Sequence, residues 1–141
     1  MFTDRTIRNM LACVVVALAA MTAPAKAGVP AQDHSFPTPE MKAFHDVMHP
    51  LVHEALPAKD AARIRAAAGD LDAGRSAILR GGTGSATGKA KLEVVKRLEA
   101  FNSSVTKLVQ ASKGTGNDAD VLTSLDAVHT AFEALVAGWP K

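Results

Sequence analysis

The sequence predicts an all-α protein, an up-down-up-down antiparallel four-helix bundle that follows a cleaved signal peptide. Three observations support this fold class. Apolar residues recur at steps of three and four along several segments, and turns rich in glycine or proline separate those segments. No segment has the apolar and polar alternation that is typical of a strand. Aromatic residues make up only 4% of the chain, which favours closely packed helices.

The first 27 residues have the organisation of a secretory signal peptide. Arg5 and Arg8 precede an uncharged apolar run from residue 10 to 21, and the small residues Ala25 and Ala27 follow it. The run is too short to span a membrane as a helix, which takes about 20 residues. We therefore expect cleavage after Ala27, a periplasmic location, and no membrane insertion of the mature chain.

The mature chain of about 114 residues is expected to hold one domain, residues 38 to 141, after an extended leader, residues 28 to 37. The only cysteine, Cys13, leaves with the signal peptide, which excludes disulfides, thiolate metal sites and covalent haem attachment. Processing also leaves 13 of the 16 basic and 13 of the 14 acidic residues. A neutral domain of this kind is not expected to bind nucleic acid or an anionic membrane.

Four segments are predicted to be helical: residues 39 to 56, 58 to 80, 89 to 112 and 118 to 138. The first begins with Thr38 as the N-cap and Pro39 at the first helical position. The last two carry apolar residues at alternating steps of four and three, a spacing typical of a bundle seam. The glycine-rich segment 81 to 88 is a loop. It is not a phosphate-binding loop, because Thr83 and Ala90 replace the required glycine and hydroxyl.

Three histidines, His45, His49 and His53, follow one another at four-residue intervals in the first predicted helix. On a helical wheel they lie at about 40°, 80° and 120° from Met41, along one edge of the apolar face. Two imidazoles one turn apart can bind a divalent metal ion. Eight residues rise about 12 Å, so a straight helix cannot bring His45 and His53 to one ion. We therefore expect His45 and His49 to form the pair.

Pro50 leaves two alternatives for His53. A proline has no N–H to donate to the carbonyl of Asp46, so the helix is expected to kink or restart between His49 and His53. Alternatively, one helix ends at His49 and Pro50 opens a short second helix, in which case His53 points elsewhere.

The third ligand is expected from the fourth helix, because in this topology the middles of the first and fourth helices lie level and His129 falls there. The predicted site is a copper or zinc centre formed by His45, His49 and His129, with support from His53. Further ligands or orienting groups are expected among Met41, Met48, Asp46, Glu54 and Asp126, with His34 as a weaker candidate.

An exported all-helical chain with methionines early in the first helix and a histidine late in the fourth resembles the periplasmic four-helix-bundle cytochromes. In their b-type members a methionine of the first helix and a histidine of the fourth hold the haem. The resemblance implies Met41 or Met48 together with His129 as axial ligands of haem b. The c-prime members attach haem through Cys-x-x-Cys-His, which this chain lacks.

These features predict a periplasmic protein that sequesters, transports or senses copper or zinc. Two alternatives stay open. One is a non-covalent haem protein that transfers electrons. The other is a structural or interaction bundle without a ligand, which pairs with a periplasmic protein or with a second copy of itself. An enzyme is not expected, because no nucleophile and base, phosphate loop or carboxylate pair stands at a diagnostic spacing.

Overall fold

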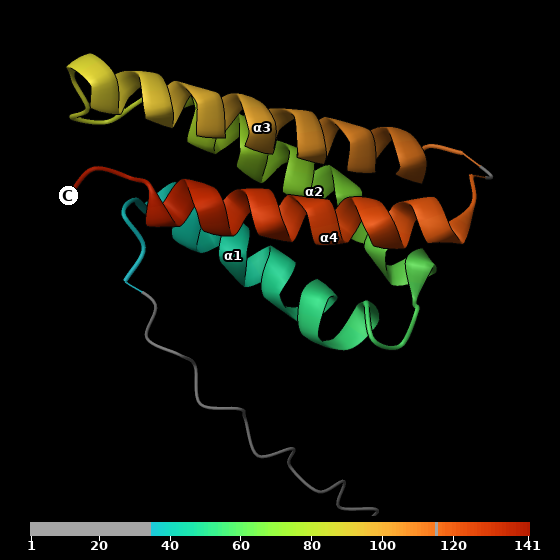
Figure 1. The fold of residues 1–141 in the computed structure, drawn as a ribbon. Coiled ribbons are helices and arrows are strands. Elements are labelled where there is room, and N and C mark those ends of the chain that lie inside the picture. Colours follow the sequence, from blue (N-terminus) through green and yellow to red (C-terminus); the bar gives the residue numbers. More distant parts are fainter. Residues whose placement is uncertain (1–34, 115) are drawn as a thin grey trace, which may run out of the picture. The chain divides into compact units, whose positions relative to one another are not determined.

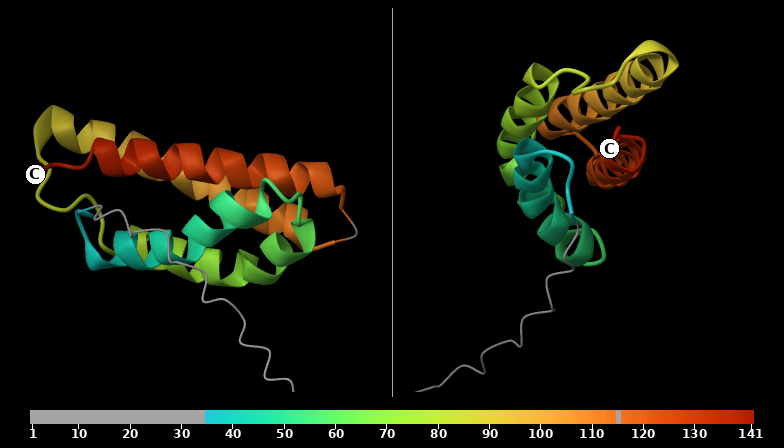
Figure 2. Two further views of the ribbon diagram at one scale, coloured as in Figure 1. Left: turned by 90° about the horizontal axis from the view of Figure 1, so that it is seen from below. Right: turned by 90° about the vertical axis from the view of Figure 1, so that its left-hand side faces the viewer.

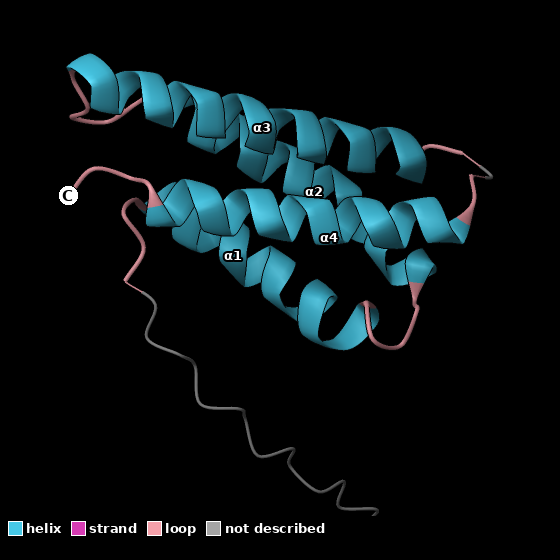
Figure 3. Cartoon of the chain, viewed as in Figure 1, coloured by secondary structure: helices cyan, strands magenta, loops and turns pink. Residues whose placement is uncertain are grey.

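The computed structural model describes residues 35 to 114 and 116 to 141, and this part of the chain is helical without any strand (Figure 3). Its elements are α1 (Pro39–Pro50), the π-helix η1 (Leu51–Ala55), α2 (Ala61–Arg80), α3 (Gly88–Ser112) and α4 (Asp118–Ala137). The predicted all-α class is confirmed. The predicted signal peptide, its cut after Ala27, most of the leader, and His34 lie outside the described residues. No helix within the described residues is long and apolar enough to cross a membrane.

The ends of the helices follow from side-chain caps. Thr38 Oγ1 accepts a hydrogen bond from the Met41 N–H at 3.3 Å, as expected for an N-cap. The start of α2 differs from the prediction by three residues. Asp60 is its N-cap and accepts from the Arg63 N–H at 3.0 Å, so the helix begins at Ala61. The bounds of α3 and α4 agree with the prediction to within one residue.

The loop from 81 to 88 packs against the C-terminal end of the chain. Gly84 has a φ of 59°, a conformation that glycine adopts without steric cost. A Cβ atom there would lie 3.2 Å from the Trp139 ring, tighter than ordinary van der Waals contact. A side chain at position 84 would therefore disturb both the turn and its contact with Trp139.

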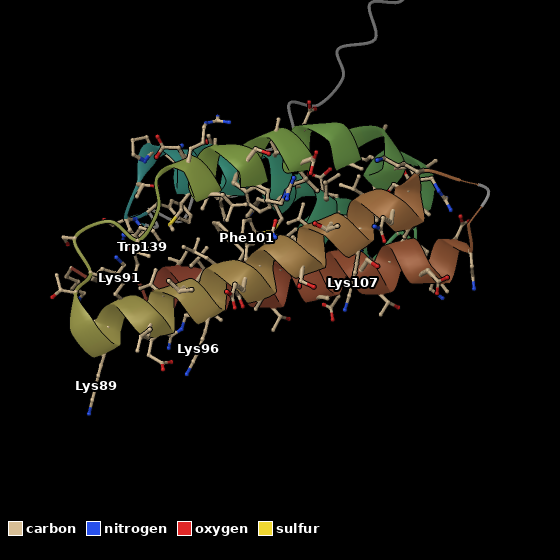
Figure 4. The ribbon with its side chains drawn as sticks, turned by 90° about the horizontal axis from the view of Figure 1, so that it is seen from above. Lys89, Lys91, Lys96, Phe101, Lys107 and Trp139 are labelled. Carbon is tan, nitrogen blue, oxygen red and sulfur yellow. The ribbon has the colours of Figure 1, made fainter. Side chains whose placement is uncertain are left out.

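One hydrophobic core joins all the helices. At its centre, the ring centroid of Phe44 on α1 lies 5.0 Å from that of Phe101 on α3 and 5.0 Å from that of Phe132 on α4. Figure 4 shows Phe101 between α3 and the helices behind it, whereas Lys89 and Lys96 point away from the domain. Burying one such side chain contributes about 1.5–3 kcal/mol. Of the predicted seam residues, Trp139 lies beyond the end of α4 and is only partly buried. The others are all buried: Val94, Leu98, Phe101, Val105, Leu108, Val121, Leu125, Val128, Phe132 and Leu135.

The helices differ in how closely their backbones approach. α3 packs along α4, and α2 packs against both α1 and α3 (Figures 1 and 2). Close approach between α4 and the first helical segment is concentrated at η1. Along α1 the seam is wider, and Phe36 lies there with ring centroids 4.7 Å from His45 and 6.2 Å from Phe132. Side chains near η1 are therefore those that α4 can reach most easily.

Candidate metal centre

Four histidine rings form a continuous series along the edge of α1 and η1 and across to α4. The ring centroids are 5.1 Å apart for His45 and His49, 4.3 Å for His49 and His53, and 6.4 Å for His53 and His129. We call these four residues the histidine row. His45 and His129 are half-buried, with side chains 21% and 27% exposed, and His53 is exposed. The row thus lies at the boundary between the core and solvent, as the helical wheel predicts.

The two pairs within the first helical segment have the same sequence spacing but different separations. In an α-helix four residues turn the chain by about 400°, so a side chain at i+4 is offset by about 40° from that at i. In η1 the hydrogen bonds span five residues, so each residue turns the chain by a smaller angle. The offset between His49 and His53 is reduced, and their rings lie closer than those of His45 and His49.

Pro50 stands where the helix changes type. It is the last residue of α1 and has no N–H for the carbonyl of Asp46. The next residue, Leu51, donates to the carbonyl of Met48, three residues back. Leu56 then donates to the carbonyl of Leu51, five residues back, at 2.8 Å.

The structure agrees only in part with the two alternatives expected for Pro50. α1 does end at Pro50, but the chain continues without a break into η1. His53 consequently stays in the histidine row, with its ring 4.3 Å from that of His49.

The neighbour of His129 differs from the expectation. In the predicted topology His129 lies opposite His45 and His49, whereas in the structure its ring lies beside that of His53. Two features account for the difference: α4 approaches the first helical segment at η1, and the π-helical turn brings His53 back toward the seam. On α4 itself, His129 Nε2 lies 3.1 Å from a carboxylate oxygen of Glu133. A carboxylate at this position orients an imidazole and leaves its other nitrogen for a metal ion.

His45 has aromatic surroundings. Its ring lies 4.7 Å from that of Phe36 and stacks with that of Phe132 at 6.4 Å. Its Nδ1 is 3.9 Å from Asp46, whose pKa is lowered by the hydrogen bond from the Lys42 ammonium at 2.7 Å. Asp46 therefore stays ionised beside His45 at neutral pH, and its contribution to stability is lost only as the pH falls below the usual carboxyl value of 3.8.

The other predicted ligands are buried in the core, paired with another residue, or exposed. Met41 and Met48 are 0% and 1% exposed and belong to the hydrophobic core. Glu54 forms an ion pair with Arg63 at 2.9 Å across the turn after η1. Asp126 is exposed on α4. For the haem alternative, the thioethers of Met41 and Met48 thus pack in the core, while His129 lies at the seam.

Among the described residues, no group of three or more His, Cys, Asp or Glu side chains is already arranged to hold a metal ion. The separations in the row nevertheless suit pairs of ligands. A metal–nitrogen bond of about 2 Å places an imidazole centroid about 3.2 Å from the ion. Two rings on one ion then have centroids about 4.5 Å apart at a right angle and about 6.4 Å apart when opposite. The centroid separations of 4.3, 5.1 and 6.4 Å in the row fall in or next to this range.

The sequence predicts the four histidines of the row and places Glu133 one turn from His129, but it does not predict the contact between Phe36 and His45. Glu133 follows His129 by four residues, a spacing that signals a contact on one helix face. Phe36 belongs to the predicted leader, where no periodicity indicates its contact with His45. Comparison with protein-family models, curated proteins and solved structures found no match to the chain.

Proposed function

We propose that this protein binds a divalent copper or zinc ion through His49, His53 and His129 of the histidine row and sequesters, transports or senses that ion in the periplasm. The observation that carries the proposal is the pair His49 and His53, whose ring centroids are 4.3 Å apart. Imidazole has a reference pKa of about 6.5, so neutral rings are available to a metal near pH 7. The proposal includes export by the N-terminal signal peptide and an up-down-up-down antiparallel arrangement of the four helices.

The ligand chemistry favours the divalent ions. Imidazole nitrogen suits both Cu(II) and Zn(II), and affinity for a given nitrogen site is higher for Cu(II). The thioethers of Met41 and Met48, which would favour Cu(I), are buried in the core. We therefore expect Cu(II) to bind more tightly than Zn(II). A site built on two imidazoles, with His129 as a third ligand and Glu133 orienting it, is expected to have a dissociation constant on the order of 1 µM, about −8 kcal/mol.

The test is calorimetric titration of the folded, purified protein with Cu(II) and with Zn(II), together with elemental analysis after dialysis. One ion per chain is expected. The double variant His49→Ala/His53→Ala should lose at least about 100-fold in affinity. A control double variant is Lys89→Ala/Lys91→Ala, which changes two exposed residues near the start of α3 and should bind as the unchanged protein does.

Two results would overturn the proposal: no binding at about 100 µM of either ion, a hundredfold above the expected dissociation constant, or equal binding by the double histidine variant. Added haem provides the contrasting measurement. A Soret band that disappears in His129→Ala would support the haem alternative in place of a copper or zinc site.

A further inference from the structure

We infer that Pro50 positions His53 for metal binding by imposing the π-helical turn Leu51–Ala55, although Pro50 itself offers no ligand atom. The inference rests on the proposed function and adds a positioning residue to the site. It explains why a histidine pair that is broken by a proline in the sequence has the closest rings of the histidine row.

The chain contains its own control for this effect. His45 and His49 are four residues apart on α1, and their ring centroids are 5.1 Å apart. His49 and His53 are also four residues apart, but Pro50 lies between them, the helix is of the π type, and the centroids are 4.3 Å apart. Between the members of the first pair every residue has a backbone N–H. The missing N–H of Pro50 is thus the covalent difference that coincides with the change of helix type.

The physical steps follow from the hydrogen bonds. Because Pro50 cannot donate to Asp46, the regular ladder of four-residue bonds is interrupted there. The chain resumes with the five-residue bond from the Leu56 N–H to the Leu51 carbonyl. A further five-residue bond, from the Asp60 N–H to the Ala55 carbonyl at 2.9 Å, secures the end of the turn.

The π-helical turn decides what His53 can reach. In an uninterrupted α-helix His53 would be rotated by about 40° beyond His49, away from the seam with α4. With the π-helical turn its ring instead lies 6.4 Å from that of His129. Pro50 therefore brings two parts of the row together: the pair on the first helical segment and the histidine on α4.

The variant Pro50→Ala restores the N–H and lets the α-helix continue through residue 55. We expect its affinity for Cu(II) to fall by about 10-fold, a typical loss when a positioning group of a metal site is removed. Its melting temperature should stay equal or rise, because proline is unfavourable inside a helix. The matched control is Pro57→Ala, an exposed proline after η1, which should change the affinity by less than about 2-fold.

Two further readouts separate positioning from a general structural effect. Backbone carbon chemical shifts should report regular α-helix through residues 51 to 55 in Pro50→Ala. The nitrogen hyperfine pattern of bound Cu(II) should show fewer coordinated imidazoles than in the unchanged protein. In the Pro50→Ala background, His53→Ala should cost less affinity than it does alone, because His53 is already displaced.

The outcomes distinguish this inference from the proposed function. An unchanged protein that binds Cu(II), together with a Pro50→Ala variant that binds equally tightly or keeps the π-helical turn, overturns the inference and leaves the proposed function intact. An unchanged protein that fails to bind overturns the proposed function and the inference with it.

Discussion

The pairs His45–His49 and His49–His53 have the same spacing in the sequence, yet they differ in geometry and surroundings. The first lies on α1 with ring centroids 5.1 Å apart, and the second enters η1 with centroids 4.3 Å apart. The difference teaches that spacing alone does not set how two side chains meet on a helix. The hydrogen-bond register of the backbone between them sets it as well.

The surroundings of the two outer histidines differ as well. His45 lies against Phe36 and Phe132 and is half-buried, so its ring belongs to the aromatic packing of the wide seam. His53 is exposed, and its ring neighbours are His49 and His129. We therefore assign a packing role to the α-helical end of the row and a binding role to its π-helical end. Three predictions test this division, from the largest expected effect to the smallest.

Acidification should weaken binding strongly, and the number of protons released on binding should identify the ligands. An imidazolium must lose its proton before its ring nitrogen can bind a metal ion, so protons compete with Zn(II) for each of the three proposed ligands, His49, His53 and His129. The affinity for Zn(II) is therefore expected to fall steeply from pH 7.5 to pH 5. Calorimetry across this range should give a limiting slope of three protons per ion in the unchanged protein and in His45→Ala, and of two in His53→Ala. A slope that is lower by one proton in His45→Ala would contradict the packing role assigned to His45.

Single substitutions should separate the two ends of the row at constant pH. His53→Ala removes a ligand and should weaken Cu(II) binding at pH 7 by about 100-fold, which corresponds to about 2.7 kcal/mol. His45→Ala should change the affinity by less than about 3-fold, although it removes the same kind of side chain from the same helix edge. Competition with a chelator of known affinity measures both. Equal losses of Cu(II) affinity in the two variants would contradict the different roles assigned to His45 and His53.

The smallest loss of affinity is expected for a substitution on α4. Glu133→Gln keeps the size of the side chain but removes the carboxylate that lies 3.1 Å from His129 Nε2. The affinity for Cu(II) should fall by about 10-fold, because the imidazole loses its orienting acceptor. Asp120→Asn on the same helix is the control, and it should bind as the unchanged protein does, since Asp120 is exposed in the first turn of α4, nine residues before His129. An equal loss in both variants would indicate a long-range charge effect instead.

Much of the fold was predictable because it depends on local patterns. Alternating steps of four and three placed the buried faces of α3 and α4, and Thr38 marked the start of α1. The start of α2 was harder to predict from the sequence. Asp60 caps that helix after a turn in which Lys59 has a φ of 55°, a conformation that lysine rarely adopts.

The candidate site was predictable as a set of residues but not as an arrangement. The helical wheel assumes 100° per residue, so it could not anticipate the smaller turn angle in η1 that brings His53 toward His49. The prediction also assumed that the middles of the first and fourth helices lie side by side. In the structure α4 comes closest to the first helical segment at η1. For these reasons His129 was expected beside His45 and His49, and its ring lies beside that of His53.

The most direct test is nuclear magnetic resonance of the histidine side-chain nitrogens during titration with Zn(II), because it reads each ring separately. At one equivalent of Zn(II), the ring nitrogens of His49 and His53 should move to the positions of metal-bound imidazole while those of His45 stay in place. Coordination at His45 and His49 without His53 would contradict the account, as would the absence of any shift.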